Sequence, residues 1–207
     1  MLKKPMIASS YPDYWEKAYQ SKDVGWDLGM PTPVFKKWIK KYKNKLSVCI
    51  LGAGNGWDAI HIAKQGHLVT AVDFAKSAIS NIENSAKKHK ISLITHHMNI
   101  FNLSNLYSNH FDVVLEYTCF CAIHPSDRRK YLEVVKHILK PKGELVGLLF
   151  PLDKNSDEEG PPFAVELQST IILISKYLNF VKQEYSPLSI KSRLGREVFI
   201  NFQKSEI

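Results

Sequence analysis

Short apolar runs and longer amphipathic stretches alternate along most of this chain. A continuous apolar run suits a parallel strand that is covered on both faces, and apolar residues spaced three and four apart suit a helix. The predicted strands are residues 48–51, 68–72, 91–97, 111–117 and 144–150, and the predicted helices between them are residues 57–65, 75–88 and 128–139. This alternation predicts an α/β fold with a mostly parallel sheet and helices on both faces.

The two ends of the chain follow other patterns. Near the C-terminus we expect a helix over residues 165–178 and then alternating strands over 180–185 and 197–203, close enough in sequence to pair antiparallel. Near the N-terminus we expect helices over residues 11–21 and 34–43, separated by a loop that contains glycine and two prolines. The chain is therefore expected to form one domain, residues 1–207, in which residues 1–45 are a helical cover over the ligand site.

A glycine-rich turn joins the first predicted strand to the helix after it. Gly52, Gly54 and Gly56 have the spacing G-x-G-x-G, and Asp73 ends the next strand. Glycine permits positive φ and leaves no Cβ between the backbone and a ligand, and helix amides exposed at such a turn can meet an anionic group. A carboxylate at the end of the second strand can accept hydrogen bonds from ribose hydroxyls, so the stretch predicts a nucleoside-containing cofactor. A dinucleotide fingerprint would need its third glycine at Trp57, and the phosphate-binding loop G-x-x-x-x-G-K-[ST] is absent.

Two further strand ends contribute to the predicted site, because ligands of open parallel sheets lie beyond the carboxyl ends of the strands. Asn99 and Ile100 follow the third strand, where an amide or a backbone group can hydrogen-bond the amine of a base. Phe101 is expected in the core. The fourth strand leads into residues 116–123, which we expect beside the reacting group.

Composition and charge narrow the class of protein. The chain has 207 residues, of which 44% are hydrophobic and 23% charged, as in ordinary globular domains. The net charge of +8 and the pI near 9.3 fit an anionic partner, but the lysines lie in short scattered clusters, which favours solvated helix faces. Cys49, Cys119 and Cys121 lack metal-ligand spacing, so neither a metal site nor a disulfide framework is expected. With no leader-like apolar segment and no long apolar run, the sequence predicts a cytoplasmic protein without a membrane partner.

The glycine turn with its following acid resembles motif I of the Rossmann-like S-adenosylmethionine methyltransferases, whose seven-stranded sheet ends in an antiparallel hairpin. More specific segments resemble the thiopurine S-methyltransferase family, and most nearly its branch that methylates halides, thiocyanate and small thiols. These segments are YWEKAYQSKDVGWDLGMPTP (residues 14–33), EYTCFCAIHPSDRRKY (116–131) and GPPF (160–163), and the likeness runs nearly end to end. The resemblance implies S-adenosylmethionine as cofactor, a small-molecule acceptor and a monomer.

The resemblance also assigns cofactor contacts to positions in this chain. It implies that Trp26 and Leu28 close over the methionine part and that Asp73 binds the ribose. The complete predicted cofactor set is Trp26, Leu28, Gly52, Gly54, Gly56, Asp73, Phe74, Asn99, Ile100, Tyr117 and Thr118. The family often carries aspartate at the position of Asn99, so a charged contact to the base becomes an amide contact here, and we expect binding to be retained but weakened.

Two residues are candidates for a direct part in catalysis. Arg128 matches the arginine of the family's Asp-Arg-x-x-Tyr segment, where a guanidinium could attract an anionic acceptor; the alternative is an exposed arginine in a first helical turn. His124 could help deprotonate a thiol; the alternative is a solvent-exposed loop histidine. A soft anionic nucleophile needs no general base, because alignment alone can supply roughly 7–11 kcal/mol. Arg193 and Arg196 are weaker candidates for attracting an anionic acceptor, and a solvated loop position is the default expectation for both.

Three functions remain open from the sequence. The resemblance favours methyl transfer to a thiol, thiopurine, thiocyanate or halide, without a nucleic-acid partner. A nucleic-acid methyltransferase would use the positive charge, but it would need a base-flipping pocket, and the Asn/Asp-Pro-Pro-aromatic motif of the adenine enzymes is missing. The third possibility is a non-catalytic protein that binds the same cofactor. The acceptor itself depends on pocket volume, which residue spacing does not reveal.

Overall fold

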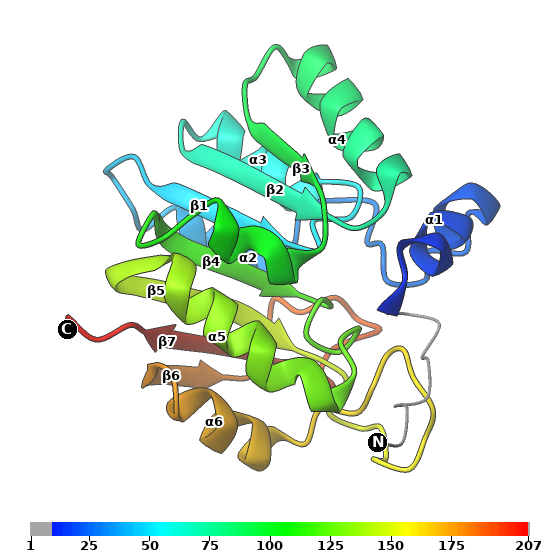
Figure 1. Cartoon of the computed structure of the whole chain (residues 1–207), viewed down its shortest axis with the longest axis vertical. Coiled ribbons are helices and arrows are strands. Elements are labelled where there is room, and N and C mark those ends of the chain that lie inside the picture. The colour runs from blue at the N-terminus through cyan, green and yellow to red at the C-terminus, as the bar shows by residue number, and fades with distance from the viewer. Residues whose placement is uncertain (1–9, 207) are drawn as a thin grey trace.

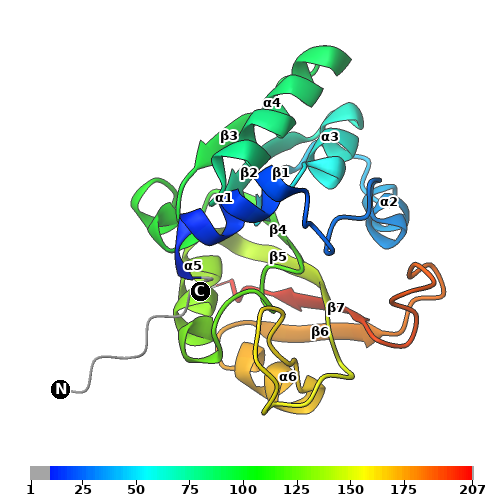
Figure 2. The same cartoon turned by 90° about the vertical axis from the view of Figure 1, so that its right-hand side faces the viewer.

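The computed structural model of the chain describes residues 10–206 (Figures 1 and 2). In this part of the chain, seven strands form one sheet in the order β3-β2-β1-β4-β5-β7-β6. The strands are β1 (Ser47–Leu51), β2 (Leu68–Asp73), β3 (Ile94–His97), β4 (Phe111–Tyr117), β5 (Leu139–Leu149), β6 (Asn179–Glu184) and β7 (Val198–Gln203). Strands β1 to β5 pair in parallel, and β7 runs antiparallel between β5 and β6. The predicted fold class, including its antiparallel C-terminal hairpin, is confirmed.

Helices cover both faces of the sheet, as predicted. They are α1 (Pro12–Ser21), α2 (Pro33–Ile39), α3 (Trp57–Lys64), α4 (Lys76–His89), α5 (Arg128–Ile138) and α6 (Leu167–Ser175). Because side chains alternate between faces along a strand, each face buries its own core. In β1, Cys49 and Leu51 pack in the core that includes α5 and α6, whereas Val48 and Ile50 pack in the core that includes α2, α3 and α4.

Several element boundaries differ from the prediction. Strand β3 begins at Ile94 rather than at residue 91, and α2 ends at Ile39 rather than at residue 43. Strand β5 begins at Leu139 rather than at residue 144, because Leu139 already pairs with Phe111 before the chain passes through the predicted turn. Helix α6 begins at Leu167 rather than at residue 165, because the carboxylate of Glu166 caps it by accepting hydrogen bonds from two backbone N–H groups of its first turn.

Helix α1 lies beyond the carboxyl ends of the central strands (Figure 1). None of its residues is fully buried, and its attachment to α4 depends on Glu16, whose carboxylate accepts hydrogen bonds from the backbone N (2.9 Å) and the Oγ (2.5 Å) of Ser77. Residues 1–9 of the predicted N-terminal cover lie outside the described residues. Within residues 10–206 no helix is both long and apolar enough to cross a membrane.

Candidate functional site

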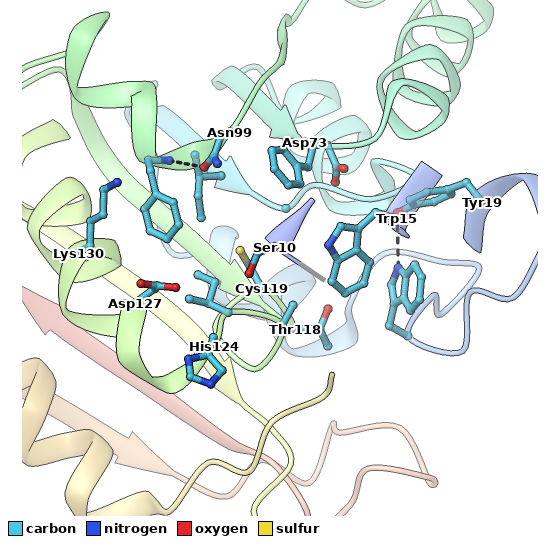
Figure 3. A pocket seen from close by; sticks show the side chains of 17 residues that line it. Ser10, Trp15, Tyr19, Asp73, Asn99, Thr118, Cys119, His124, Asp127 and Lys130 are labelled. Atoms are coloured by element: carbon cyan, nitrogen blue, oxygen red, sulfur yellow. Dashed lines mark hydrogen bonds between the residues drawn. The ribbon is translucent and has the colours of Figure 1, made fainter. Parts of the chain in front are cut away.

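A cavity of about 340 Å³ opens beside the glycine turn, at the carboxyl ends of β1, β2 and β4 (Figure 3); we call it the glycine-turn cavity. Its volume lies in the range of small-molecule sites, which is about 300–1,000 Å³. The predicted cofactor residues that line it are Trp26, Gly52, Asp73, Phe74, Asn99, Ile100 and Thr118. A small adjoining cavity of about 60 Å³ is also lined by Leu28, Gly54 and Tyr117. The fold thus gathers these predicted residues at one edge of the sheet.

Asp73 holds the floor of the glycine-turn cavity in place. Its two carboxylate oxygens accept hydrogen bonds from the backbone N–H groups of Gly54 (2.8 Å) and Ala75 (2.9 Å). Burial raises the pKa of Asp73, and these N–H bonds oppose the rise. Because an ionised carboxylate has about four lone-pair sites, Asp73 can shape the turn and still accept bonds from a ligand.

Gly56 is not among the residues that line either cavity, which differs from its predicted cofactor role. Its φ of +76° lies in the left-handed region, and a Cβ at this position would come within 2.5 Å of the Cγ1 atom of Ile82. The glycine is therefore required for the start of α3 and for its packing against α4. The spacing of the motif does not distinguish this requirement from close approach to a ligand.

The far end of the glycine-turn cavity is lined by Asn99, Ile100 and Phe101. The Oδ1 atom of Asn99 accepts a hydrogen bond from the backbone N–H of Phe101 (2.9 Å) and so caps the short 3-10 helix Ile100–Asn105. Phe101 packs against the core, as expected, and also lines the cavity, where the ammonium group of Lys130 lies 4.8 Å from its ring centre. The amide of Asn99 thus shapes this end of the cavity as well as lining it.

Aromatic side chains from α1 and the following loop close the other side of the cavity, as Figure 3 shows for Trp15 and Tyr19. The Trp15 and Trp26 rings meet edge to face at 5.3 Å between centroids, and Trp26 Nε1 donates to the Tyr19 hydroxyl at 3.4 Å. Sequence reasoning did not assign Tyr19 to the site. The sequence feature that could have identified Tyr19 is its spacing from Trp15: the two residues lie four apart, and so on one face, of a helix with few other apolar groups.

Two aspartates fasten the loop that carries Trp26 to the glycine turn and α3. Asp27 accepts hydrogen bonds from Trp57 Nε1 (2.6 Å) and from the side chain of Asn55. Asp58 accepts from both the backbone N–H (2.8 Å) and the hydroxyl (2.7 Å) of Thr32, and burial raises the pKa of Asp58 to about 6. Both carboxylates line the small cavity, so they fix the loop and contribute negative charge to the site.

A larger cavity of about 940 Å³ lies on the other side of Trp15 and Trp26; we call it the aromatic cavity. Its walls come from α1, from the segment after β4, from Phe150, Pro161 and Pro162, and from the loop before β7. Trp15, Trp26, Thr118 and Ala122 line both this cavity and the glycine-turn cavity. A ligand in one cavity therefore shares these walls with a ligand in the other.

Arg193 is buried in the wall of the aromatic cavity, which corrects the expectation of a solvated loop residue. It is 5% exposed, its guanidinium lies 4.7 Å from the ring centres of both Tyr117 and Phe150, and its Nη2 donates to the carbonyl of Trp26 at 2.8 Å. Its Nη1 has no hydrogen-bond partner in the described structure. Arg196 behaves as expected, half exposed and paired with a surface aspartate.

The two predicted catalytic residues occupy different environments. His124 lines the glycine-turn cavity (Figure 3), its Nδ1 lies 2.7 Å from Ser126 Oγ, and its ring meets Phe163 edge to face. Arg128 lines none of the three cavities. It is 7% exposed, and its Nη2 donates to the carbonyl of Ala164 at 2.9 Å. The structure therefore brings His124 to the site but not Arg128.

Comparison with known proteins identifies the family of this chain. The family model for thiopurine S-methyltransferase matches residues 10–198. The chain is 30% identical over 198 residues to the probable thiol methyltransferase 2 of Arabidopsis thaliana (92% of this chain, 84% of that protein) and 26% identical over 196 residues to thiocyanate methyltransferase 1 of the same plant (92% and 84%). A solved structure of magnesium protoporphyrin IX methyltransferase from Synechocystis PCC 6803 with bound SAM matches the fold with a TM-score of 0.77 at 11% identity, over 98% of this chain and 100% of that one. The chain belongs to the thiopurine S-methyltransferase family.

Proposed function

We propose that this protein is an S-adenosylmethionine-dependent methyltransferase that methylates a small soft nucleophile, with a thiol as its main acceptor. The observation that carries the proposal is the meeting of two unlike cavities at four shared residues, Trp15, Trp26, Thr118 and Ala122. Membership of a methyltransferase family supports the reaction class. The likeness to proteins named thiol and thiocyanate methyltransferases supports the acceptor class.

The charge of the glycine-turn cavity and the small cavity suits this cofactor. Their acidic lining residues are Asp27, Asp58, Asp73 and Asp127. Lys130 is the only lysine or arginine among the described residues that line them. A ligand that carries a positively charged sulfur is therefore favoured over an anionic nucleotide.

The shape of the lining also fits the parts of the cofactor. Asp73 would hold the ribose hydroxyls, and Phe74 and Ile100 would enclose the flat base between apolar surfaces. Trp26 and Leu28 would cover the methionine part from the side of the small cavity. When bound, S-adenosylmethionine supplies an electrophilic methyl group attached to a sulfonium.

The residues of this chain contribute orientation and exclusion of water. Transfer in line requires the acceptor to approach along one axis, and the shared walls Trp26 and Thr118 restrict that approach. Cys119 also lines the glycine-turn cavity, but burial raises the pKa of its thiol well above the ordinary value. The protonated thiol is a poor nucleophile, so it does not compete with the acceptor.

The aromatic cavity favours a thiol with an apolar body over a halide. Its volume of about 940 Å³ far exceeds the needs of a single ion, and aromatic side chains such as Tyr14 and Phe150 form much of its wall. The buried guanidinium of Arg193 would attract a thiolate or another anionic group. A thiolate needs no general base, and His124, which lines the glycine-turn cavity but not the aromatic cavity, would take a proton only from a thiol that reaches past the shared wall.

A turnover assay tests the proposal. The protein is incubated with methyl-labelled S-adenosylmethionine and, separately, an aromatic thiol, hydrogen sulfide, thiocyanate and iodide, and methylated products are quantified by headspace or liquid chromatography. We expect the highest kcat/KM for the aromatic thiol. Donor binding in calorimetry without turnover on any acceptor would favour the non-catalytic alternative, and tight nucleic-acid binding at physiological salt would favour the nucleic-acid enzyme. The monomeric state and the cytoplasmic location stay predictions from the sequence.

A further inference from the structure

Residues 118–121 form a turn at the boundary between the glycine-turn cavity and the aromatic cavity. Thr118 lines the glycine-turn, small and aromatic cavities, and its φ of +61° is unusual for a residue with a branched side chain. Cys119 packs so closely on the glycine turn that a Cβ at Gly52 would lie 3.1 Å from its sulfur. A small movement of this turn would therefore change both the cofactor wall and the approach of the acceptor.

Glu116, on strand β4, holds this turn in place through a hydrogen bond. It lies near the end of β4, is 2% exposed, and its Oε1 accepts a hydrogen bond from the backbone N–H of Phe120 at 2.7 Å. On β5 its register partner is Gly147, where a Cβ would come within 3.0–3.1 Å of the Glu116 side chain. The neighbouring strand thus leaves room for this carboxylate, which no proposed catalytic step uses.

Arg128 holds the same turn from the side of α5. Its guanidinium lies 4.6 Å from the ring centre of Phe120, and its bond to the carbonyl of Ala164 ties the turn to the loop after β5. Its positive charge acts on Glu116 and opposes the rise in the pKa of that carboxyl. Glu116 Oε2 and Arg128 Nε each lack a hydrogen-bond partner among residues 10–206. A buried carboxyl group and a buried guanidinium therefore act on one residue of the turn, Glu116 on its backbone and Arg128 on its ring.

We propose that Glu116 and Arg128 are positioning residues for methyl transfer, a role that rests on the proposed function: together they hold residues 118–121 in the shape that aligns the acceptor with the cofactor. This differs from the role expected for Arg128 from the family resemblance, because the guanidinium acts through Phe120 and Ala164 rather than on an acceptor. Loss of either charge leaves the other buried without compensation, so each single variant should disturb the turn more than loss of both.

The ionisation of Glu116 gives this role a distinct pH signature. Burial raises the pKa of Glu116 to about 7 from 4.5. Besides Arg128, the titratable groups that face it are Cys119, Cys121 and Tyr131. Burial raises the pKa of each of those three groups, so they stay neutral near pH 7. As the pH rises through about 7, the carboxylate ionises, accepts the Phe120 N–H more strongly and is attracted by the charge of Arg128, and kcat should rise.

Stability should change in the opposite direction. Because the folded pKa of Glu116 lies above its ordinary value, the folded state binds the proton more tightly than the unfolded state does. The free energy of unfolding should therefore fall as the pH rises from 4.5 to about 7, while kcat rises. A role in overall stability alone would not produce these opposite trends.

The test compares Glu116→Gln with Glu144→Gln, a matched control on β5. Glu144 is also a hydrogen-bonded glutamate of the sheet, accepting from Tyr42 and Asn201, but it lies opposite Val113, near the start of β4 and away from the 118–121 turn. We expect E116Q to lower kcat by about 10- to 100-fold, as misplacement by about 1 Å can do, and to raise the donor Kd by a smaller factor, because the turn also forms part of the cofactor wall. The ratio of wild-type to E116Q kcat, measured with one acceptor, should rise as the pH passes through about 7. E144Q should leave kcat and this pH dependence unchanged.

The partner variants complete the test. Arg128→Lys keeps the charge but loses the planar guanidinium, and should lower kcat for neutral and anionic acceptors alike. Arg128→Met should be rescued in stability by E116Q in the double variant. A folded E116Q with wild-type kcat and pH profile overturns the proposal; if E116Q does not fold, wild-type kcat in R128K overturns it instead. Wild-type protein without turnover on any acceptor would overturn the proposed function, whereas an active wild type with an equally active E116Q overturns only the positioning role.

Discussion

The glycine-turn cavity and the aromatic cavity share walls but are built in different ways. The glycine-turn cavity is formed largely by successive strand–helix units, and its floor is fixed by local hydrogen bonds such as the one from Gly54 N–H to Asp73. The aromatic cavity is closed by α1 and by loops that lie far apart in the sequence, with Arg193 bonded to the carbonyl of Trp26. If the proposed function is right, recognition of the cofactor depends on the sheet, and recognition of the acceptor depends on how loops pack onto it.

The two cavities also differ in charge. Four aspartates and a single lysine line the glycine-turn and small cavities, among the residues that the structure describes. The aromatic cavity is lined by three cations, Lys17, Arg193 and Arg196, and two aspartates, Asp13 and Asp23, of which Arg193 alone is buried. Under the proposed function, the first side suits a cationic cofactor and the buried guanidinium on the other suits an anionic acceptor. Substitutions can therefore be chosen to weaken the binding of one ligand, donor or acceptor, and leave the binding of the other unchanged.

Asp73→Ala should give the largest loss of affinity, and the loss should be limited to the donor, which is proposed to bind in the glycine-turn cavity. The substitution removes the acceptor of two backbone N–H bonds and the proposed partner of the ribose. Hydrogen bonds to a charged group are worth about 1.5–3 kcal/mol each, so the Kd for S-adenosylmethionine or S-adenosylhomocysteine should rise by at least about 100-fold in calorimetry.

Asp112→Ala is the matched control for this variant. Asp112 accepts hydrogen bonds from Ser47 N–H and from Lys140, near the amino end of the parallel sheet. Its donor Kd should stay within about threefold of wild type. Equal donor affinity in D73A and wild type would refute the assignment of Asp73.

The same contrast explains which features could be predicted from the sequence. The glycine turn and Asp73 could be predicted because strand, turn, helix and strand end follow one another within a short segment. The burial of Arg193 could not, because it depends on Trp26, Tyr117 and Phe150, which arrive from three other segments. Gly56 was assigned to the cofactor because glycine spacing alone does not reveal whether a missing Cβ makes room for a ligand or for a neighbouring side chain.

Trp26→Ala should weaken binding on both sides of the shared wall. Its indole lines all three cavities and contacts Trp15 and Tyr19. We expect the donor Kd and the acceptor KM each to rise by about tenfold, the equivalent of about 1.4 kcal/mol. Trp26→Phe, which keeps an aromatic ring but loses the N–H donor to Tyr19, should recover most of both losses. A change in only one of the two constants would show that Trp26 belongs to one cavity.

Arg193→Met should affect the aromatic cavity alone. Loss of the buried guanidinium should raise KM for a thiolate or thiocyanate by about tenfold and leave the donor Kd within about threefold of wild type. Arg196→Met is the control, because Arg196 is half exposed and paired with Asp153, and exposed pairs contribute about 0–1 kcal/mol. Equal KM increases for anionic and neutral acceptors would indicate that Arg193 supports the cavity wall rather than binding charge.

Gly56→Ala should have the smallest effect on binding, although it lies inside the motif that predicts the cofactor. The added Cβ would overlap Ile82 at 2.5 Å while the backbone keeps a φ of +76°, so the free energy of unfolding should fall by about 1–3 kcal/mol. Gly66→Ala separates these two causes, because Gly66 has a φ of +90° but nothing within 4 Å of its added Cβ. The difference in denaturant midpoint between the two variants then measures the overlap with Ile82. If G56A is as stable as wild type yet fails to bind S-adenosylmethionine, Gly56 belongs with Gly52 and Gly54 at the cofactor, and the local part of the site extends to the N-cap of α3.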